Sequence, residues 1–125
     1  MWTQNNMNSE PLGSGNSTQQ KSLTGLSVPT ALNWHCEAVC NYDCTFCYAP
    51  FEDQRKRSRL TSEEGCKVIE NLVSAGIQKI NFVGGEPMLH PHIRDWIRHS
   101  KKVGMTTSIV SNGTRMDGQF LSDMV

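Results

Sequence analysis

Three cysteines stand within eight residues, Cys40, Cys44 and Cys47, at C-x3-C-x2-C spacing. Thiolates are ligands for soft or borderline metals, and three in so short a segment can converge on one centre. An iron–sulfur cubane normally takes four cysteine ligands, so a compact set of three indicates a [4Fe-4S] cluster with one iron left open for a ligand that is not protein. An iron with an open coordination position can bind a small molecule and take part in its reaction.

A structural zinc site is the alternative interpretation of the same residues. Zinc also takes four thiolates, and Cys36 stands four residues before Cys40, so the all-thiolate set would be Cys36, Cys40, Cys44 and Cys47. Zinc ribbons and fingers usually place a second pair of ligands about a dozen or more residues after the first, and the sequence has no such second pair. The spacing favours iron–sulfur and leaves zinc open.

Composition limits the function classes. The chain has 125 residues and a formal net charge of zero, which fits one domain without a general affinity for nucleic acid or anionic membranes. Its five cysteines are clustered and follow no secretory leader, so a disulfide framework is not expected. No apolar run approaches the ~18 residues of a membrane span. We expect a cytoplasmic protein with no membrane and no nucleic-acid partner.

The composition changes near Pro29. Residues 1–29 are rich in Asn, Gln, Ser, Thr and Gly with scattered single apolar residues, so they cannot bury enough surface to offset the entropy lost on ordering. This predicts a disordered leader at 1–29 and a folded region at 30–125. Within that region the charged run at 52–59 includes four basic residues. It indicates a solvated loop, with contact to a phosphate-bearing substrate as the alternative.

Helix signals occur at three places. Thr61 and Glu64 form a capping box, and Gly76 occupies the position of a C-terminal glycine. A second helix is expected between Pro91 and Gly104, and a third after an Asp117 N-cap. The expected buried faces are Cys66, Ile69, Leu72, Val73 and Gly76, then Ile93, Trp96, Ile97 and Ser100, then Leu121, Met124 and Val125. Cys66 is therefore predicted to be a core thiol. Helix-surface positions are predicted for His90, His92 and His99.

Three short segments rich in apolar and β-branched residues predict strands, at 30–36, 79–83 and 105–110. Strands that alternate with helices through short links form right-handed βαβ units and a parallel sheet. The carboxyl ends of parallel strands share one edge, where α/β folds build their sites. The cysteine loop and the turns at 84–87 and 111–113 each follow a strand, so we expect all three at this edge. A lone zinc knuckle predicts no such convergence.

The two turns have residue types suited to a polar ligand. Gly84 and Gly85 permit close approach of backbone to a ligand, and the Glu86 carboxylate can accept hydrogen bonds from an ammonium group. Ser111 and Asn112 have the hydroxyl and amide needed to bind ribose hydroxyls. The alternatives are structural: a strand-to-helix turn often requires glycines, and Ser-Asn-Gly is typical of a tight turn with a serine cap.

Together these motifs resemble the radical S-adenosylmethionine (SAM) enzymes. The resemblance implies that Cys40, Cys44 and Cys47 hold a [4Fe-4S] cluster, and that SAM chelates the open iron and is cleaved reductively to a 5′-deoxyadenosyl radical, with electrons from a donor such as flavodoxin or ferredoxin. The SAM-binding residues that it implies are Phe46, Tyr48, Gly84, Gly85, Glu86, Ser111 and Asn112. The fold that it implies is α/β, a partial (β/α)6 barrel with parallel strands and outer helices. Residues 30–125 would supply about three of its βα units, so we expect a truncated, N-terminal half.

A narrower resemblance covers about residues 30–116. Asn-Trp-His at 33–35, Cys-Asn-Tyr at 40–42, Lys-Ile-Asn-Phe at 79–82 and Ser-Ile-Val-Ser-Asn-Gly at 108–113 together resemble the viperin family, prokaryotic members above all. This implies dehydration of a nucleoside triphosphate to its 3′-deoxy-3′,4′-didehydro form in antiviral defence. It carries over Asn33 and Lys79 as substrate contacts. Strand alternation adds Asn81 on the face of Lys79, with Ile80 and Phe82 opposite.

Two alternatives to this function stay open. One is a radical SAM enzyme acting on another substrate, through peptide or cofactor modification, because the cluster and SAM motifs are shared. The other, of a different class, is a zinc-binding interaction module.

Overall fold

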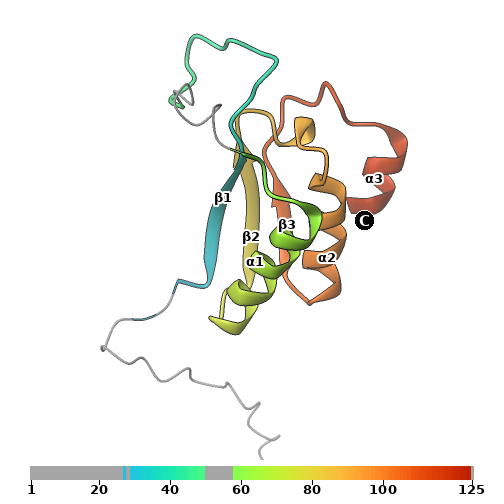
Figure 1. Cartoon of the computed structure of the whole chain (residues 1–125). Coiled ribbons are helices and arrows are strands. Elements are labelled where there is room, and N and C mark those ends of the chain that lie inside the picture. The colour runs from blue at the N-terminus through green and yellow to red at the C-terminus, as the bar shows by residue number, and fades with distance from the viewer. Residues whose placement is uncertain (1–26, 28, 50–57, 125) are drawn as a thin grey trace, which may run out of the picture.

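The fold is a three-stranded parallel sheet with helices on one face. The computed structural model describes residue 27, residues 29–49 and residues 58–124. The strands β1 (Ala31–Glu37), β2 (Lys79–Gly84) and β3 (Thr106–Ile109) pair in the order β1-β2-β3. The helices are α1 (Ser62–Ser74), the 3-10 turn η1 (Pro87–Leu89), α2 (Ile93–Lys102) and α3 (Gly118–Met124). Figure 1 shows the strands running in one direction with α1 and α2 across the same face.

The predicted βαβ order and parallel sheet are confirmed, with strand ends displaced by about one residue. The first strand starts at Ala31 and continues to Glu37, and the third is shorter than expected, at Thr106–Ile109. The predicted leader lies outside the described residues apart from Ser27 and Pro29. Among the residues described, no helix has the length and apolar character needed to cross a membrane.

Both ends of α1 follow the sequence signals. The Thr61 side chain accepts from the Glu64 backbone N–H, and the Glu64 side chain accepts from the Thr61 N–H, which completes the capping box. At the other end Gly76 has φ 93°, and its N–H donates to Val73 while the Ile77 N–H donates to Leu72. These two bonds are the Schellman arrangement that a C-terminal glycine permits.

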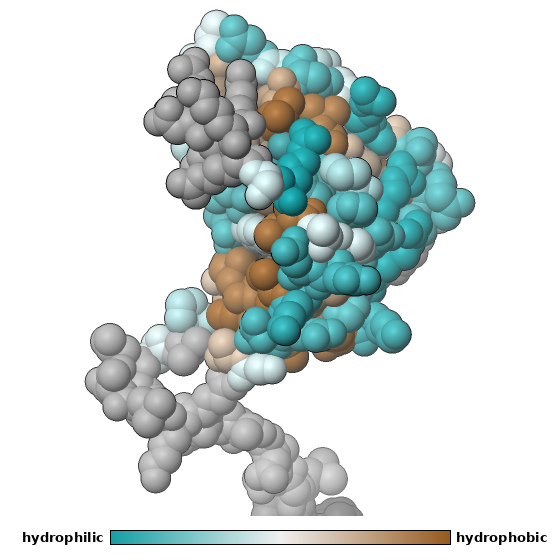
Figure 2. Space-filling model, in the orientation of Figure 1, coloured by the Kyte–Doolittle hydropathy of each residue, from teal (hydrophilic) through white to brown (hydrophobic). Residues whose placement is uncertain are grey.

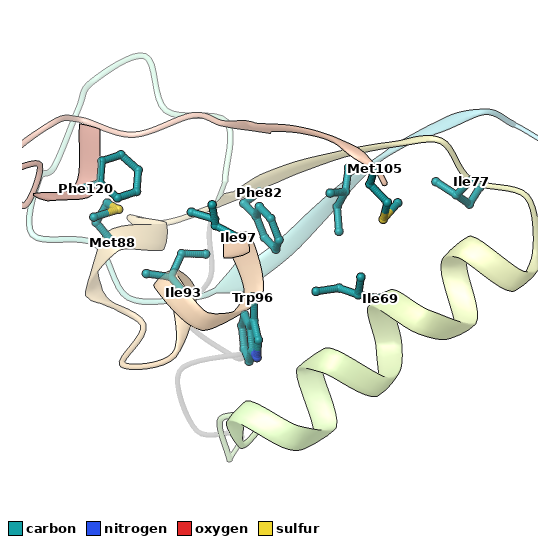
Figure 3. Close-up of a cluster of buried hydrophobic side chains, with 10 residues drawn as sticks. Ile69, Ile77, Phe82, Met88, Ile93, Trp96, Ile97, Met105 and Phe120 are labelled. Atoms are coloured by element: carbon teal, nitrogen blue, oxygen red, sulfur yellow. The ribbon is translucent and has the colours of Figure 1, made fainter. Parts of the chain in front are cut away.

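The core lies between the sheet and the helices, as Figure 3 shows. Ile80 and Phe82 of β2 are fully buried against Ile69 of α1 and Trp96 of α2, so the prediction for this strand face is confirmed. Trp34 of β1 stacks on Trp96 with ring centroids 4.9 Å apart. All four residues of the predicted α2 face are buried, namely Ile93, Trp96, Ile97 and Ser100.

The predicted helix faces were wrong at two positions, and one core residue was missed. Val73 and Leu121 are exposed. In α3 the missed residue is Phe120, which enters the core, while Met124 packs against the core as predicted and Val125 lies outside the described residues. Asp117 caps the helix as predicted, accepting from the Phe120 N–H at 2.7 Å, and Phe120 enters the core because α3 packs beside α2.

His90 was also predicted wrongly as a surface residue. The 3-10 turn η1 precedes α2 and turns His90 into the core, where its ring lies 4.2 Å from the Trp96 ring, centroid to centroid. Burial lowers the pKa of His90. His92 is only half-buried, and His99 contacts Glu70 of α1 at 3.2 Å. The local sequence showed where α2 begins and gave no sign of the preceding turn.

The opposite face of the sheet is polar. Asn33, Asn81 and Ser108 are register neighbours on the three strands. The Asn81 amide donates to Asn33 Oδ1 at 3.1 Å, and the Ser108 hydroxyl donates to Asn81 Oδ1 at 3.1 Å. Figure 2 shows the other side of the molecule, where hydrophilic side chains cover most of the helices and apolar side chains show between them. The sheet therefore has one face for packing and one lined by hydrogen-bonding groups.

Candidate functional site

The cysteine loop begins at a break in the pairing of β1 with β2. His35 pairs with Val83 and Glu37 pairs with Gly84, so Cys36 is an extra residue in β1. A bulge of this kind redirects a strand and often lies beside a functional site. Up to His35 the odd-numbered residues of β1 are exposed, whereas Glu37 beyond the break is buried. Beyond Glu37 the chain rises over the strand ends (Figure 1).

Gly84 and Gly85 pack against residues 37–39, the stem of the cysteine loop. The Gly85 N–H donates to Glu37 O at 2.7 Å, and the Glu86 N–H donates to Val39 O at 2.8 Å. A Cβ atom on Gly84 would overlap the Glu37 carbonyl, and one on Gly85 would lie 2.5 Å from Val39 O. The close approach that the sequence assigned to a ligand is therefore made here by the chain's own backbone.

One hollow of about 630 Å³ collects the predicted motifs. The cysteine loop, the turn after β2 and the turn after β3 all line it, as expected for the carboxyl edge of a parallel sheet. Every predicted site residue except Lys79 contributes to this hollow. The predicted residues in its lining are Asn33, Cys40, Cys44, Phe46, Cys47, Tyr48, Asn81, Gly84, Gly85, Glu86, Ser111 and Asn112.

The three predicted cluster ligands are free thiols. Cys40 and Cys44 are half-buried and Cys47 is exposed. The Cys47 N–H donates to Cys44 O at 3.0 Å, which closes a turn, and the Tyr42 N–H donates to Cys40 Sγ at 3.4 Å. Within the described part of the chain, no three His, Cys, Asp or Glu side chains are close enough together to hold a metal ion. The donor set fits an iron–sulfur cluster in type and number, because three thiols line one hollow and one metal position is left for another ligand.

Cys36 does not join them. Its thiol donates to Val83 O at 3.5 Å and packs against the core. Burial, together with the nearby Glu37 and Glu86 carboxylates, raises the pKa of Cys36 to about 12. The fourth ligand of the alternative all-thiolate zinc site therefore packs against the core and does not line the hollow that the other three thiols share. Cys66 packs against the core as predicted.

Alkylation of the metal-free, reduced chain should separate these two groups of cysteines. We expect iodoacetamide at pH 8 to label Cys40, Cys44 and Cys47 about tenfold or more faster than Cys36, because the thiolate is the nucleophile and Cys36 stays protonated and buried. Peptide mass spectrometry over a time course measures each site. Labelling of Cys36 as fast as Cys47 would place it in the exposed group and restore the four-cysteine set.

Glu86 joins the ends of two strands. It is fully buried, and its Oε1 accepts from the Met88 N–H at 2.9 Å and the Ser111 hydroxyl at 2.8 Å. Its Oε2 accepts from the Asn112 N–H at 2.7 Å. An ionised carboxylate offers about four acceptor positions, so three donors leave about one for a ligand in the hollow.

Ser111 and Asn112 form a tight turn, as the structural alternative for this motif predicted. The Ser111 hydroxyl accepts from the Gly113 N–H, and Asn112 Oδ1 accepts from the Thr114 N–H and hydroxyl. The Asn112 amide then donates to Asn41 Oδ1 at 2.9 Å. The turn is thereby tied to the cysteine loop while both residues still line the hollow. A ribose role for them remains a prediction.

The predicted substrate residues lie on β1 and β2, nearer the amino ends of the strands than the cysteine loop. Asn33 and Asn81 line the main hollow and also a neighbouring one of about 270 Å³. Lys79 lines only the smaller hollow and is exposed at the start of β2. Ser108, which the sequence reasoning missed, continues the polar row on β3. Strand alternation would have indicated it, since Ser108 and Val110 fall on one face of the strand predicted at 105–110.

Several exposed apolar side chains surround the hollow. Phe46 is 87% exposed and Tyr48 80%, and both were predicted. Tyr42 and Val110 were missed, although both line the hollow. Tyr42 lies inside the cysteine motif and Val110 ends the predicted third strand, so position alone would have indicated both. Large exposed apolar groups around a hollow that also holds a few polar side chains are typical of a ligand site.

The fold and the site define a class of enzyme, and comparison with known proteins names it. Residues 38–125 match the radical SAM superfamily, and the chain belongs to that superfamily. The same fold occurs in SuiB from Streptococcus suis, solved in complex with its precursor peptide SuiA. That likeness has a TM-score of 0.69 at 18% identity and covers 78% of this chain and 22% of SuiB. The predicted fold class is confirmed.

Relatives narrow the resemblance within the superfamily. The chain is 38% identical over 105 residues to an S-adenosylmethionine-dependent nucleotide dehydratase from Flammeovirga pacifica, covering 81% of this chain and 36% of the relative. It is 36% identical over 108 residues to one from Lacinutrix mariniflava, covering 83% and 22%. A PqqA peptide cyclase from Bradyrhizobium diazoefficiens is 26% identical over 106 residues, covering 85% and 28%. The chain thus spans about a third or less of the length of these relatives.

Proposed function

We propose that this chain is the cluster- and SAM-binding part of an enzyme that dehydrates a nucleoside triphosphate to its 3′-deoxy-3′,4′-didehydro form. The observation that carries the proposal is the single hollow shared by the three cysteines, the Glu86 carboxylate and the Asn33–Asn81 amides. Two relatives named nucleotide dehydratases, at 38% and 36% identity, support it. A cytoplasmic role in antiviral defence, with reduction by a flavodoxin or ferredoxin, is part of the same proposal.

Different residues of the hollow would bind the cluster and SAM. Cys40, Cys44 and Cys47 would hold a [4Fe-4S] cluster, which with bound SAM supplies a 5′-deoxyadenosyl radical. Glu86, at the end of β2, presents a carboxylate to an ammonium group, a contact strengthened by charge. The exposed Phe46 and Tyr48 rings line the hollow and offer apolar contact to a bound ligand.

The substrate residues then lie along the sheet away from the cysteines. Asn33 and Asn81 present amides that can donate to and accept from sugar hydroxyls. Lys79 lies beyond them, where an ammonium can meet a base edge or a phosphate. The cysteine loop and the amide pair line the same hollow, so these residues would hold the cofactor and the sugar next to each other.

A peptide substrate is the second candidate. The PqqA peptide cyclase relative and the fold likeness to SuiB with its bound precursor peptide favour it. Its structural support is the exposed carboxyl edge, where Phe46, Tyr48 and Val110 offer apolar contacts to an extended chain. The first candidate ranks higher because the nucleotide dehydratases have the higher identity.

Product analysis tests the proposal. We would extend the chain after Val125 with the corresponding remainder of the Flammeovirga pacifica relative, reconstitute it anaerobically and supply SAM and dithionite. Each of the four ribonucleoside triphosphates would be added in turn, with release of 5′-deoxyadenosine and a nucleotide product lighter by one water followed by mass spectrometry. One triphosphate should raise turnover at least about tenfold above the uncoupled background. If none does, the nucleotide assignment fails, and an arm with a peptide substrate decides the second candidate.

Replacing Glu86 by glutamine should weaken SAM binding. A hydrogen bond to a charged partner contributes about 1.5–3 kcal/mol, so the dissociation constant measured by calorimetry should rise roughly ten- to hundredfold. Glu64→Gln, in the exposed capping box of α1, is the matched control and should leave the constant unchanged. Iron content should stay at the wild-type level in both variants. An unchanged SAM affinity in Glu86→Gln would remove Glu86 from the ligand site and leave it only its role in joining β2 to β3.

A further inference from the structure

An ion pair closes the base of the cysteine loop. Glu37, the last residue of β1, is buried, with its side chain 2% exposed. Arg59 lies just before α1, and its Nε is 2.9 Å from Glu37 Oε2. The three cysteines lie between these two residues in the sequence. The pair therefore joins the point where the chain leaves the sheet to the point where it returns to the helical layer.

The same carboxylate also shapes the first residues of the loop. Glu37 Oε1 accepts from the Ala38 N–H at 2.8 Å and from the Val39 N–H at 2.9 Å. The Val39 carbonyl in turn accepts from the Glu86 N–H. One side chain thus fixes the direction of the stem that leads to Cys40.

Burial makes Arg59 necessary to this arrangement. Removing a carboxylate from water costs much free energy unless a cation or hydrogen-bond donors compensate. The two backbone donors serve Oε1, whereas Oε2 accepts no aligned hydrogen bond from the described residues and has the Arg59 guanidinium beside it. Arg59 is half-exposed, so removing its charge would cost free energy mainly by leaving the buried Glu37 carboxylate without a cation.

We propose that Glu37 and Arg59 form a clasp that positions the cysteine loop for cluster binding. Both are positioning residues, since neither lines the hollow. The inference rests on the proposed function only in assigning a cluster to the loop. A purely structural ion pair would stabilise the fold without affecting the thiols, and this is the difference to be tested.

The variants are Glu37→Gln, Arg59→Gln and Arg59→Lys, with Arg94→Gln as control. Arg94 makes a 2.7 Å ion pair with Asp117 between α2 and the start of α3, away from the cysteines. Three quantities are measured for each variant of the chain: iron bound per chain after anaerobic reconstitution together with the electron paramagnetic resonance signal of the reduced sample, the rate of Cys40 alkylation in the metal-free protein, and the melting temperature.

In Glu37→Gln and Arg59→Gln we expect bound iron to fall at least about threefold and Cys40 to be alkylated about tenfold faster, since about 1.4 kcal/mol of loop opening gives a tenfold change. Arg59→Lys keeps the charge and should recover most of both properties. Arg94→Gln should match the wild type in iron and in alkylation.

Wild-type iron and alkylation in Glu37→Gln and Arg59→Gln would overturn the clasp, even with a lowered melting temperature. If the wild type itself bound no cluster, the proposed function would fail while the alkylation rates would still decide the clasp. Arg59→Gln serves if Glu37→Gln does not fold, because Arg59 is half-exposed and its loss leaves the core intact.

Discussion

Alanine at any one of Cys40, Cys44 and Cys47 should abolish the broad absorbance near roughly 400 nm that a reconstituted iron–sulfur protein shows. Each thiolate would hold a different iron of the proposed cluster, and a cubane that loses one protein ligand beside an already open iron has two irons without a protein ligand. We expect bound iron to fall to the background in all three variants. Iron and sulfide analysis after desalting measures it.

Cys36→Ala and Cys66→Ala are the matched controls. Both thiols pack against the core, so both variants should keep the absorbance and the full iron content with only a modest loss of stability. Zinc analysis of the same samples tests the alternative site. Full loss of iron in Cys36→Ala, with iron retained in Cys40→Ala, would contradict the assignment.

Gly84→Ala should destabilise the chain more than alanine at either Gly104 or Gly118. Gly84 has φ 149°, which an alanine adopts only with strain, and the new Cβ would overlap the Glu37 carbonyl. Strained backbone costs on the order of 1–3 kcal/mol, and the overlap with another backbone adds to it. We expect the free energy of unfolding to fall by about 3 kcal/mol or more, measured by urea titration.

These two control glycines separate the causes. Gly104 has φ 87° with open space around its Cα, so Gly104→Ala reports the backbone strain alone and should cost about 1 kcal/mol. Gly118 has open space and no positive φ, so Gly118→Ala should be neutral or slightly stabilising. A Gly84→Ala variant no less stable than Gly104→Ala would show that the stem of the cysteine loop moves aside freely.

The sequence indicated the fold well because its signals are local. The Thr61–Glu64 capping box and Gly76 set the ends of α1 from residues a few positions apart. The site followed from topology, since turns after parallel strands must share an edge, and all three predicted turns line one hollow. The sequence was therefore sufficient to predict features that depend on neighbouring residues or on the order of strands and helices along the chain.

The missed residues depend on partners far away in the sequence. Glu37 is buried because the extra residue at Cys36 breaks the alternation of β1, and no local pattern shows a bulge. Arg59 belongs to a charged run that looked solvated, yet it pairs with that buried carboxylate. Phe120 enters the core because α3 packs beside α2. Each outcome was decided by tertiary packing rather than by propensity.

The position of Glu86 makes the motifs thermodynamically dependent on one another. Its carboxylate holds the end of β3 through Ser111 and Asn112, and Asn112 holds the cysteine loop through Asn41. Whatever binds the carboxylate also acts on the order of both loops. Linkage is reciprocal. If a ligand raises the equilibrium constant for ordering the cysteine loop by a given factor, the ordered loop binds that ligand more tightly than the unordered loop by the same factor. The final stability of the loaded protein would therefore be the same in whichever order the chain acquires its ligands.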